Sequence, residues 1–224
     1  MKIFHGSDHI IERPALGVGR KNNDYGQGFY CTEQLEMAKE WACKNGTDGF
    51  VNAYELDLDG PKVLRLGADG NTILNWIAVL LEHRTFNLDG EVAAGARDYL
   101  IAHFGIDISR YDVVIGYRAD DSYFSFAEAF VSNALSLRSL GRAMHLGKLG
   151  EQVVLVSEKA FSRLQFLEAV PIPKELYAAK FLARDKEARR QYKEEVASAA
   201  VLKEDLFVLD IIRQEMRNDD PRLQ

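Results

Sequence analysis

The sequence predicts an α+β fold in which short strands and helices are mixed and the C-terminal part is helical. Short apolar runs bounded by turn residues recur through residues 1–172, as they do in strands. Between these runs, apolar residues recur three and four positions apart, as they do along one face of a helix. Residues 174–218 contain no glycine and combine many charges with periodic apolar residues. We therefore expect one domain over residues 1–172 and a helical extension over residues 173–224 packed on it.

The N-terminal elements are the easiest to place. "KIFHGS" at residues 2–7 is a short apolar run closed by a turn signal, so it predicts a first strand. Residues 11–23 are rich in glycine, proline and asparagine and predict a long loop. "GFYCT" at residues 28–32 predicts a second strand, and residues 33–46 have the spacing of a helix that stops at a glycine. The alternating segment at residues 50–58 predicts a third strand.

The remaining segments continue the mixed pattern. Helical spacing recurs in three of them, at residues 71–84, 92–105 and 122–136. Short apolar runs typical of strands lie at residues 111–117, 151–157 and 165–170. Ser157 can cap the short turn between the last two strands. From residue 174 onward we expect two or three helices on the outside of the sheet.

Composition excludes several classes of function. The net charge is −6 and the pI is near 5.5, which argues against non-specific electrostatic binding of nucleic acid. No run of about 18 apolar residues is present, so we expect no membrane span. The first ten residues lack an apolar signal-peptide core, which makes the cytoplasm the expected compartment. The two cysteines do not suggest a disulfide framework, and the five histidines show no metal-ligand spacing.

Two short motifs carry the chemistry. In "HGS", His5, Gly6 and Ser7 place an imidazole, a bare main chain and a hydroxyl together at a strand end. In "DYGQGFY", Gly26 and Gly28 permit a close approach to the backbone, and Tyr30 can present its ring to a flat heterocycle. The alternative for the first motif is an ordinary strand end followed by a turn.

Together these motifs resemble a known type of site. "HGS" followed by "YGQGFYCTEQLEMAKEWA" resembles the site of the poly(ADP-ribose) polymerase type of ADP-ribosyltransferase, in which a second stacking aromatic follows the tyrosine by eleven residues. Trp41 holds that position here, with core packing as its alternative role. Over nearly all of residues 1–170 the chain resembles the bacterial family called domain of unknown function 3990, through "NDYGQGFYCT", "YDVVIGYRADDSYF" and "EQVVLVSEKAFSRLQF".

The resemblance implies a fold and an activity. The fold would be an ADP-ribosyltransferase-like split antiparallel β-core with a cleft between two sheets. The activity would be mono-ADP-ribosyl transfer, in which the nicotinamide–ribose bond of NAD is cleaved and ADP-ribose passes to a macromolecule, a protein rather than a nucleic acid. The bacterial resemblance suggests a toxin or a phage-associated effector. Gly6 and Ser7 would bind the carboxamide, Tyr30 and Trp41 the nicotinamide ring, and His5 a ribose hydroxyl, so that His5 and Tyr30 belong to the catalytic set.

The late strand "EQVVLVS" departs from that family. Its members place a glutamate at the start of this strand, and the alignment puts Gln152 on that position with Glu151 one residue earlier. Successive side chains of a strand point to opposite faces, so only one of the two can face the site. Gln152 is the first candidate, and Glu151 is the alternative if a bulge alters the register. A glutamine here argues against chain-forming polymerase activity, and a Gln152→Glu change is expected to raise NAD turnover if the new carboxylate stays ionised.

Two more residues complete the expected NAD site. Arg20 precedes "KNND" and either binds the pyrophosphate or is a solvated loop residue. Asp121 follows the buried strand at residues 111–117 and either positions a ribose or acceptor, or caps the next helix. A second hypothesis stays open beside the enzyme, namely a catalytically inactive pseudo-transferase that binds NAD or ADP-ribose.

Overall fold

The computed structural model describes residues 1–119, 121–144, 150–198, 202 and 204–223. Seven strands form one sheet in the order β4-β5-β6-β2-β1-β3-β7. The strands are β1 (Lys2–Ser7), β2 (Phe29–Thr32), β3 (Gly49–Leu56), β4 (Val63–Arg65), β5 (Val113–Tyr117), β6 (Glu151–Leu155) and β7 (Leu164–Ile172). All neighbouring strands are antiparallel except β4 and β5, which are parallel.

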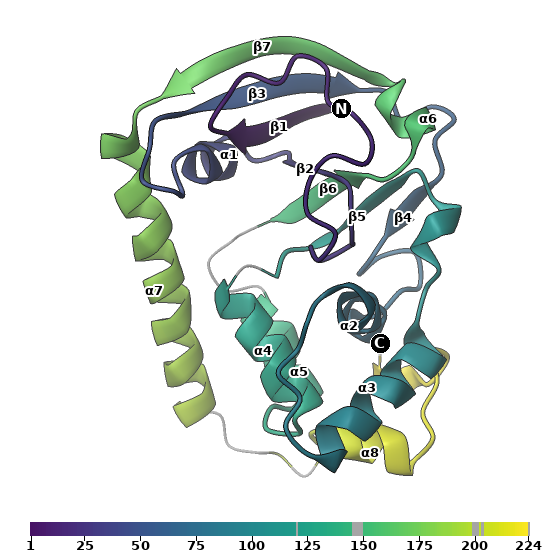
Figure 1. Cartoon of the computed structure of the whole chain (residues 1–224). Coiled ribbons are helices and arrows are strands. Elements are labelled where there is room, and N and C mark those ends of the chain that lie inside the picture. The colour runs from purple at the N-terminus through teal and green to yellow at the C-terminus, as the bar shows by residue number, and fades with distance from the viewer. Residues whose placement is uncertain (120, 145–149, 199–201, 203, 224) are drawn as a thin grey trace.

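Eight α-helices accompany the sheet in the described part of the chain. They are α1 (Leu35–Ala42), α2 (Ile73–His83), α3 (Glu91–Phe104), α4 (Asp121–Val131), α5 (Leu137–Met144), α6 (Glu158–Phe161), α7 (Lys174–Ser198) and α8 (Val208–Arg213). Two short 3-10 turns lie at Ile108–Arg110 and Pro221–Leu223. In Figure 1, α1 lies beside β1 and β3, the helices α2 to α5 and α8 gather at the other end, and α7 descends from the end of β7. The predicted α+β class is confirmed.

The sheet has a narrow seam between β1 and β2. These two strands pair at only one position, Phe4 with Thr32, whereas β1 and β3 pair along the whole of β1. The structure thus has one continuous sheet, not the two separate sheets expected from the resemblance. Its two well-paired parts, β4-β5-β6-β2 and β1-β3-β7, meet at this seam, with His5 and Tyr30 on either side of it.

The two faces of the sheet bury different cores. Val114 of β5 and Val154 of β6 pack into the large cluster formed with α2, α3, α4, α5 and α8. Their neighbours Val113 and Leu155 pack on the opposite face, against residues of β1, β3 and α6. Because side chains alternate along a strand, Gln152 shares the face of Val154, and Glu151 points to the other face.

Helix α2 lies at the centre of the large core and brings an arginine toward the seam. Thr72 begins it with a capping box, in which Asn75 accepts a hydrogen bond from the Thr72 amide. Its side chains are buried almost all round, and Trp76 is fully buried. The helix ends at His83, and the next residue, Arg84, lies at the cleft described below.

Two features differ from the sequence-based expectation, since strand β4 and helix α5 were not expected. After residue 173 the described chain forms two α-helices, α7 and α8, and two or three were expected. Strand β7 ends at Ile172, and α7 begins at Lys174. None of the described helices combines the length and the apolar character needed to cross a membrane.

Candidate functional site

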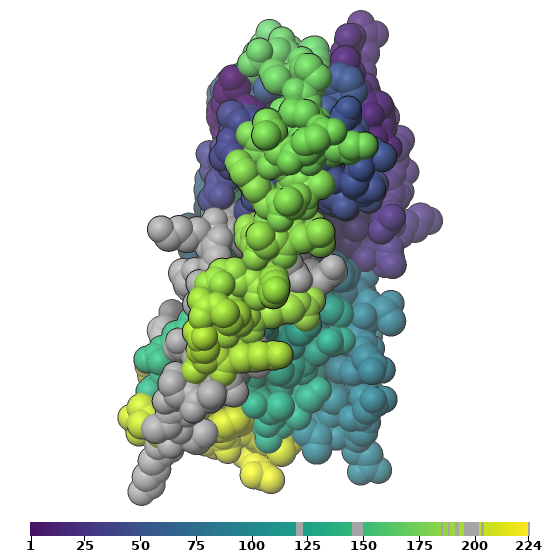
Figure 2. Space-filling model, turned by 90° about the vertical axis from the view of Figure 1, so that its left-hand side faces the viewer, coloured from purple at the N-terminus to yellow at the C-terminus, as the bar shows by residue number. Residues whose placement is uncertain are grey.

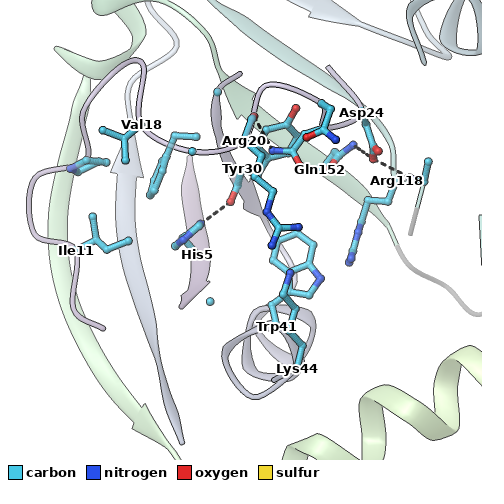
Figure 3. Close-up of a pocket in the computed structure, with 18 of the residues that line it drawn as sticks. His5, Ile11, Val18, Arg20, Asp24, Tyr30, Trp41, Lys44, Arg118 and Gln152 are labelled. Atoms are coloured by element: carbon cyan, nitrogen blue, oxygen red, sulfur yellow. Dashed lines mark hydrogen bonds between the residues drawn. The ribbon is translucent and has the colours of Figure 1, made fainter. Parts of the chain in front are cut away.

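A cleft of about 970 Å³ opens beside the β1–β2 seam (Figure 3). Its walls come from β1, β2, the loop that precedes β2, α1 and the residues after it, the end of α2, the segment after β5, β6, and Phe181 of α7. Seven of the residues expected at the site line it: His5, Gly6, Arg20, Gly28, Tyr30, Trp41 and Gln152. The fold therefore brings together side chains that are as far apart in sequence as β1 and β6.

His5 is held by its neighbours across the seam. Its Nδ1 lies 2.7 Å from the carbonyl oxygen of Tyr30, and its ring stacks on Phe29 with 4.5 Å between ring centroids. Burial lowers the pKa of His5, so the neutral ring is favoured. Because a carbonyl only accepts, Nδ1 carries the hydrogen, and Nε2 remains as an acceptor for a ligand hydroxyl.

At Gly6 and Gly28 the neighbouring elements pack so closely that a side chain would overlap them. A Cβ at Gly6 would lie 2.1 Å from the carbonyl oxygen of Ala38 in α1. A Cβ at Gly28 would lie 2.7 Å from Val154 Cγ1 on the neighbouring β6. Both glycines line the cleft, and both also allow close packing of the elements that form its walls.

Tyr30 is oriented by the turn that precedes β2. Its hydroxyl donates to the carbonyl oxygen of Gly26 (2.7 Å) and accepts from the amide of Tyr25 (3.0 Å). Gly26 has φ of 69°, a conformation that glycine adopts without strain. These two bonds occupy the hydroxyl and hold the ring beside the cleft. The aromatic ring is therefore the part of Tyr30 that can contact a ligand.

Trp41 is already in contact with a cation. The guanidinium of Arg118 lies 3.9 Å from the centroid of the Trp41 ring, and Arg118 is only 4% exposed. This cation–π contact covers one face of the indole. Trp41 was expected to stack on the nicotinamide ring. On this face of the indole it cannot do so, because the Arg118 guanidinium lies there instead.

Gln152 is buried and bonded to a carboxylate that the sequence analysis did not single out. Its Nε2 donates to Asp24 Oδ2 (2.8 Å) and to the carbonyl oxygen of Tyr117 (3.1 Å). Asp24 also accepts from Arg84 (2.8 Å) and from the amide of Ala119 (2.9 Å). Burial raises the pKa of Asp24, and the bonds from Ala119 and Gln152 with the charges of Arg84 and Arg118 oppose that rise.

Three expected residues do not contribute a described side chain to this cleft. The Ser7 hydroxyl donates to the His9 carbonyl oxygen (2.6 Å) and accepts from Asn52 (2.9 Å), so it holds the chain after β1 in place. Glu151 is exposed and points away from the face of Gln152, because the pairing of β6 with β2 and β5 shows no bulge. Asp121 begins α4, and its side chain lies outside the described residues.

The cleft is cationic although the chain is acidic. Of the described residues that line it, one, Asp24, carries a carboxylate. Five carry a permanent positive charge: Arg13, Arg20, Lys44, Arg84 and Arg118. Sequence reasoning found only Arg20 among these six, because the others come together through the fold and not through a local pattern. The described residues contain no group of three or more His, Cys, Asp or Glu side chains placed to hold a metal ion.

Comparisons with known proteins place the chain in a family. No curated protein and no solved structure matches it. The sequence model of the family described as "Protein of unknown function (DUF3990)" matches residues 1–166, well over half of the chain. The protein therefore belongs to the DUF3990 family.

Proposed function

We propose that this protein is an NAD-dependent mono-ADP-ribosyltransferase that binds NAD in the cleft beside the β1–β2 seam. The observation that carries the proposal is the meeting of His5, Tyr30 and Gln152, from three different strands, in one cleft with an excess of cationic side chains. NAD joins two flat heterocycles, nicotinamide and adenine, through riboses to a doubly charged pyrophosphate, and the cleft offers partners for nicotinamide, the adjacent ribose and the pyrophosphate.

Three parts of NAD have a partner of suitable chemistry in the cleft. The nicotinamide fits the side where the Gly6 main chain and the Tyr30 ring line the cleft. The pyrophosphate fits the cationic side chains, of which Arg13, Arg20 and Lys44 are exposed and can reach a ligand that enters from solvent. His5 Nε2 and Gln152 are acceptors for hydroxyls of the ribose next to nicotinamide.

The proposed reaction is a displacement at the anomeric carbon. The bond from C1′ to the nicotinamide nitrogen breaks, and both of its electrons leave with nicotinamide, which becomes neutral. The positive charge passes to C1′ and the ring oxygen of the ribose, as in glycoside hydrolysis. A nucleophile on the acceptor then bonds to C1′ and loses its proton to water. We propose a protein as the acceptor.

One observation favours a second candidate, a pseudo-transferase that binds NAD without cleaving it. The strand position that resembles a catalytic glutamate holds Gln152, whose amide carries no charge to stabilise the developing cation. The two candidates differ in a single measurement. Nicotinamide release from NAD supports the enzyme, and NAD binding without release supports the pseudo-transferase.

We predict that Arg20→Ala weakens NAD binding about ten-fold, because one charge-assisted bond to the pyrophosphate contributes about 1.5 kcal/mol. Arg213→Ala is the matched control, since Arg213 is an exposed arginine on α8 and does not line the cleft. Isothermal calorimetry with NAD, and chromatography of released nicotinamide, measure both variants. Equal affinities of the two variants, or a wild-type chain that does not bind NAD, would contradict the proposal.

A further inference from the structure

Asp24 is the one acidic side chain among the described residues that line the cleft, and it is 7% exposed. Its two carboxylate oxygens accept from three donors. Arg84 bonds to Oδ1, while the Ala119 amide and Gln152 Nε2 bond to Oδ2. Arg84 is a cation, and among the described residues only donors bond to these two oxygens, so the arrangement favours the ionised carboxylate over the protonated acid.

The bond from Gln152 to Asp24 fixes which way the glutamine amide faces. The Nε2 atom donates to two acceptors, Asp24 Oδ2 and the carbonyl oxygen of Tyr117, and an amide oxygen could bond to neither. The opposite atom, Oε1, has no hydrogen-bond partner in the part of the chain that the structure describes. Since Gln152 lines the cleft, Oε1 is the atom that it offers to a ligand.

We propose that Asp24 and Gln152 together form the acidic group of this site. Asp24 supplies the negative charge and acts as the positioning residue that turns Gln152 Oε1 toward the ribose, and Oε1 accepts a ribose hydroxyl. This inference rests on the proposed function, because it assigns the two residues to the ribose of NAD. A glutamate would combine charge and acceptor in one side chain, whereas this chain divides them between a loop and a strand (Figure 3).

Two cations, Arg84 and Arg118, act on the charge of Asp24, and the bonded one lies at the oxygen that faces away from Gln152. Arg84 bonds to Oδ1, and its guanidinium also lies 4.5 Å from the centroid of the Phe124 ring. Oδ2 is the oxygen on the side of Gln152, 2.8 Å from Nε2. The low polarity of a buried site strengthens the interaction of this charge with a cation in the cleft.

The same geometry reverses the expectation for Gln152→Glu. A glutamate at residue 152 would set its carboxylate against Asp24 Oδ2, where Nε2 now lies 2.8 Å away. Two carboxylates that close cannot both remain ionised, so one of them takes up a proton. We therefore expect this single change to lower turnover and not to raise it. In the double variant Asp24→Asn/Gln152→Glu, the new amide at residue 24 can donate to the new carboxylate, and the number of charges is that of the natural chain.

The test compares the natural chain with Asp24→Asn, Gln152→Glu and the double variant, with Asp98→Asn on the exposed face of α3 as the charge-matched control. Two ligands separate charge from shape. One is ADP-ribose, and the other is its analogue with a protonated pyrrolidine in place of the reacting ribose. Because the analogue carries the positive charge of the transition state, the natural chain should bind it at least ten-fold tighter than ADP-ribose. Asp24→Asn should abolish this preference, and the double variant should restore it.

Nicotinamide release gives a second readout. Asp24→Asn should lower kcat about a hundred-fold with KM changed little, because the lost charge acts on the transition state. The double variant should recover at least ten-fold of that loss, which a merely structural role of Asp24 would not produce. Circular dichroism confirms that each variant is folded.

Gln152→Leu keeps the test decisive if Asp24→Asn does not fold. It removes the acceptor and leaves the charge, so ADP-ribose affinity should fall about ten-fold while the preference for the cationic analogue persists. The inference alone is overturned if the natural chain binds ADP-ribose and does not favour the analogue. It is also overturned if Asp24→Asn keeps the preference, if the double variant does not regain it, or if Gln152→Leu binds ADP-ribose normally. A natural chain that binds neither ligand overturns the proposed function as well.

Discussion

Single residues at this site serve packing and recognition at once, and the glycines show it best. Gly6 was singled out because a bare main chain can bind a carboxamide, and it does line the cleft. The structure adds that α1 crosses β1 so closely that a Cβ at Gly6 would overlap the Ala38 carbonyl. This close crossing brings Trp41 and Lys44 of the α1 segment to the cleft. The glycine therefore positions the wall of the site as well as lining it.

We predict that Gly6→Ala destabilises the protein by about 3 kcal/mol or more, because the new methyl meets backbone atoms 2.1 and 2.6 Å away that cannot move without shifting α1. Gly95→Ala in α3 is the control, since its Cβ would meet nothing within 4 Å and alanine favours a helix by about 1 kcal/mol. Urea unfolding of both variants measures the two effects. A Gly6→Ala protein as stable as the natural chain would show that α1 does not pack on β1 in this way.

The residues that sequence reasoning missed are those whose meaning depends on distant partners. In the sequence, Asp24 is typical of a turn before "YGQGFY". In the structure it bonds to Arg84, Ala119 and Gln152, which lie 60 to 128 residues away along the chain. Arg118 reads as part of a polar loop, and only the fold lays it on Trp41. His5, Gly28 and Tyr30 could be predicted from the sequence because they belong to two short local motifs, "HGS" and "DYGQGFY". Gln152 was predicted through the resemblance, which aligns it with the family's glutamate, and strand periodicity then separated it from Glu151.

At the scale of elements, the β1–β2 seam makes this region sensitive to pH. One register pair joins the two strands, and the His5 contact with the Tyr30 carbonyl oxygen adds a second link. Burial lowers the pKa of His5 from 6.5, whereas the unfolded chain keeps the ordinary value. Between these two pKa values the unfolded state binds more protons than the folded state. The free energy of unfolding therefore falls as the pH drops below about 6.5.

We predict that His5→Gln removes part of this pH dependence. Glutamine can still donate to the Tyr30 carbonyl oxygen, and it does not titrate. Urea midpoints at pH 5, 6 and 7 should fall less steeply with acid for the variant than for the natural chain. His83→Gln is the informative comparison, because burial lowers the pKa of His83 in the same direction although His83 does not belong to the seam. If the midpoints of the His5→Gln and natural chains run parallel, His5 does not titrate with folding.

Elements were predictable where their pattern was long and local. All the strands that alternate or form clear apolar runs were found, and Ser157 caps α6 as expected. Strand β4 was missed because it has only three residues and gains its place by pairing with β5. Helix α5 was missed because Gly141 and two arginines obscure its apolar face, although Leu140 and Ala143 are buried. Such elements depend on tertiary contacts more than on local propensity.

At the scale of the whole molecule, the C-terminal extension is part of the structure of the domain. Figure 2 shows α7 along one face, from the region of β7 to the α4 and α5 helices, and α7 contacts α1, α4 and α5. Arg184 of α7 bonds to Glu40 of α1 (2.7 Å), with both side chains mostly buried. Farther along, α8 places Val208 and Ile211 in the large core. The family match ends at residue 166, but the packing of the core does not.

We predict that a chain ending at residue 172 does not fold cooperatively. Among the described residues it would lose four side chains that are at most 5% exposed, namely Val208, Ile211, Met216 and Leu223. Each such side chain contributes about 1.5 to 3 kcal/mol on burial, and the sum is comparable to the roughly 5 to 15 kcal/mol by which a typical domain is stable. Two point variants test whether lost burial is the cause. Ile211→Ala should lower the free energy of unfolding by about 2 to 5 kcal/mol. Leu182→Ala, at a side chain 68% exposed on α7, should change it by less than about 0.5 kcal/mol. Calorimetry and urea unfolding measure all three chains. A cooperative transition of natural stability in the chain of residues 1–172 would instead show that the domain folds without the extension.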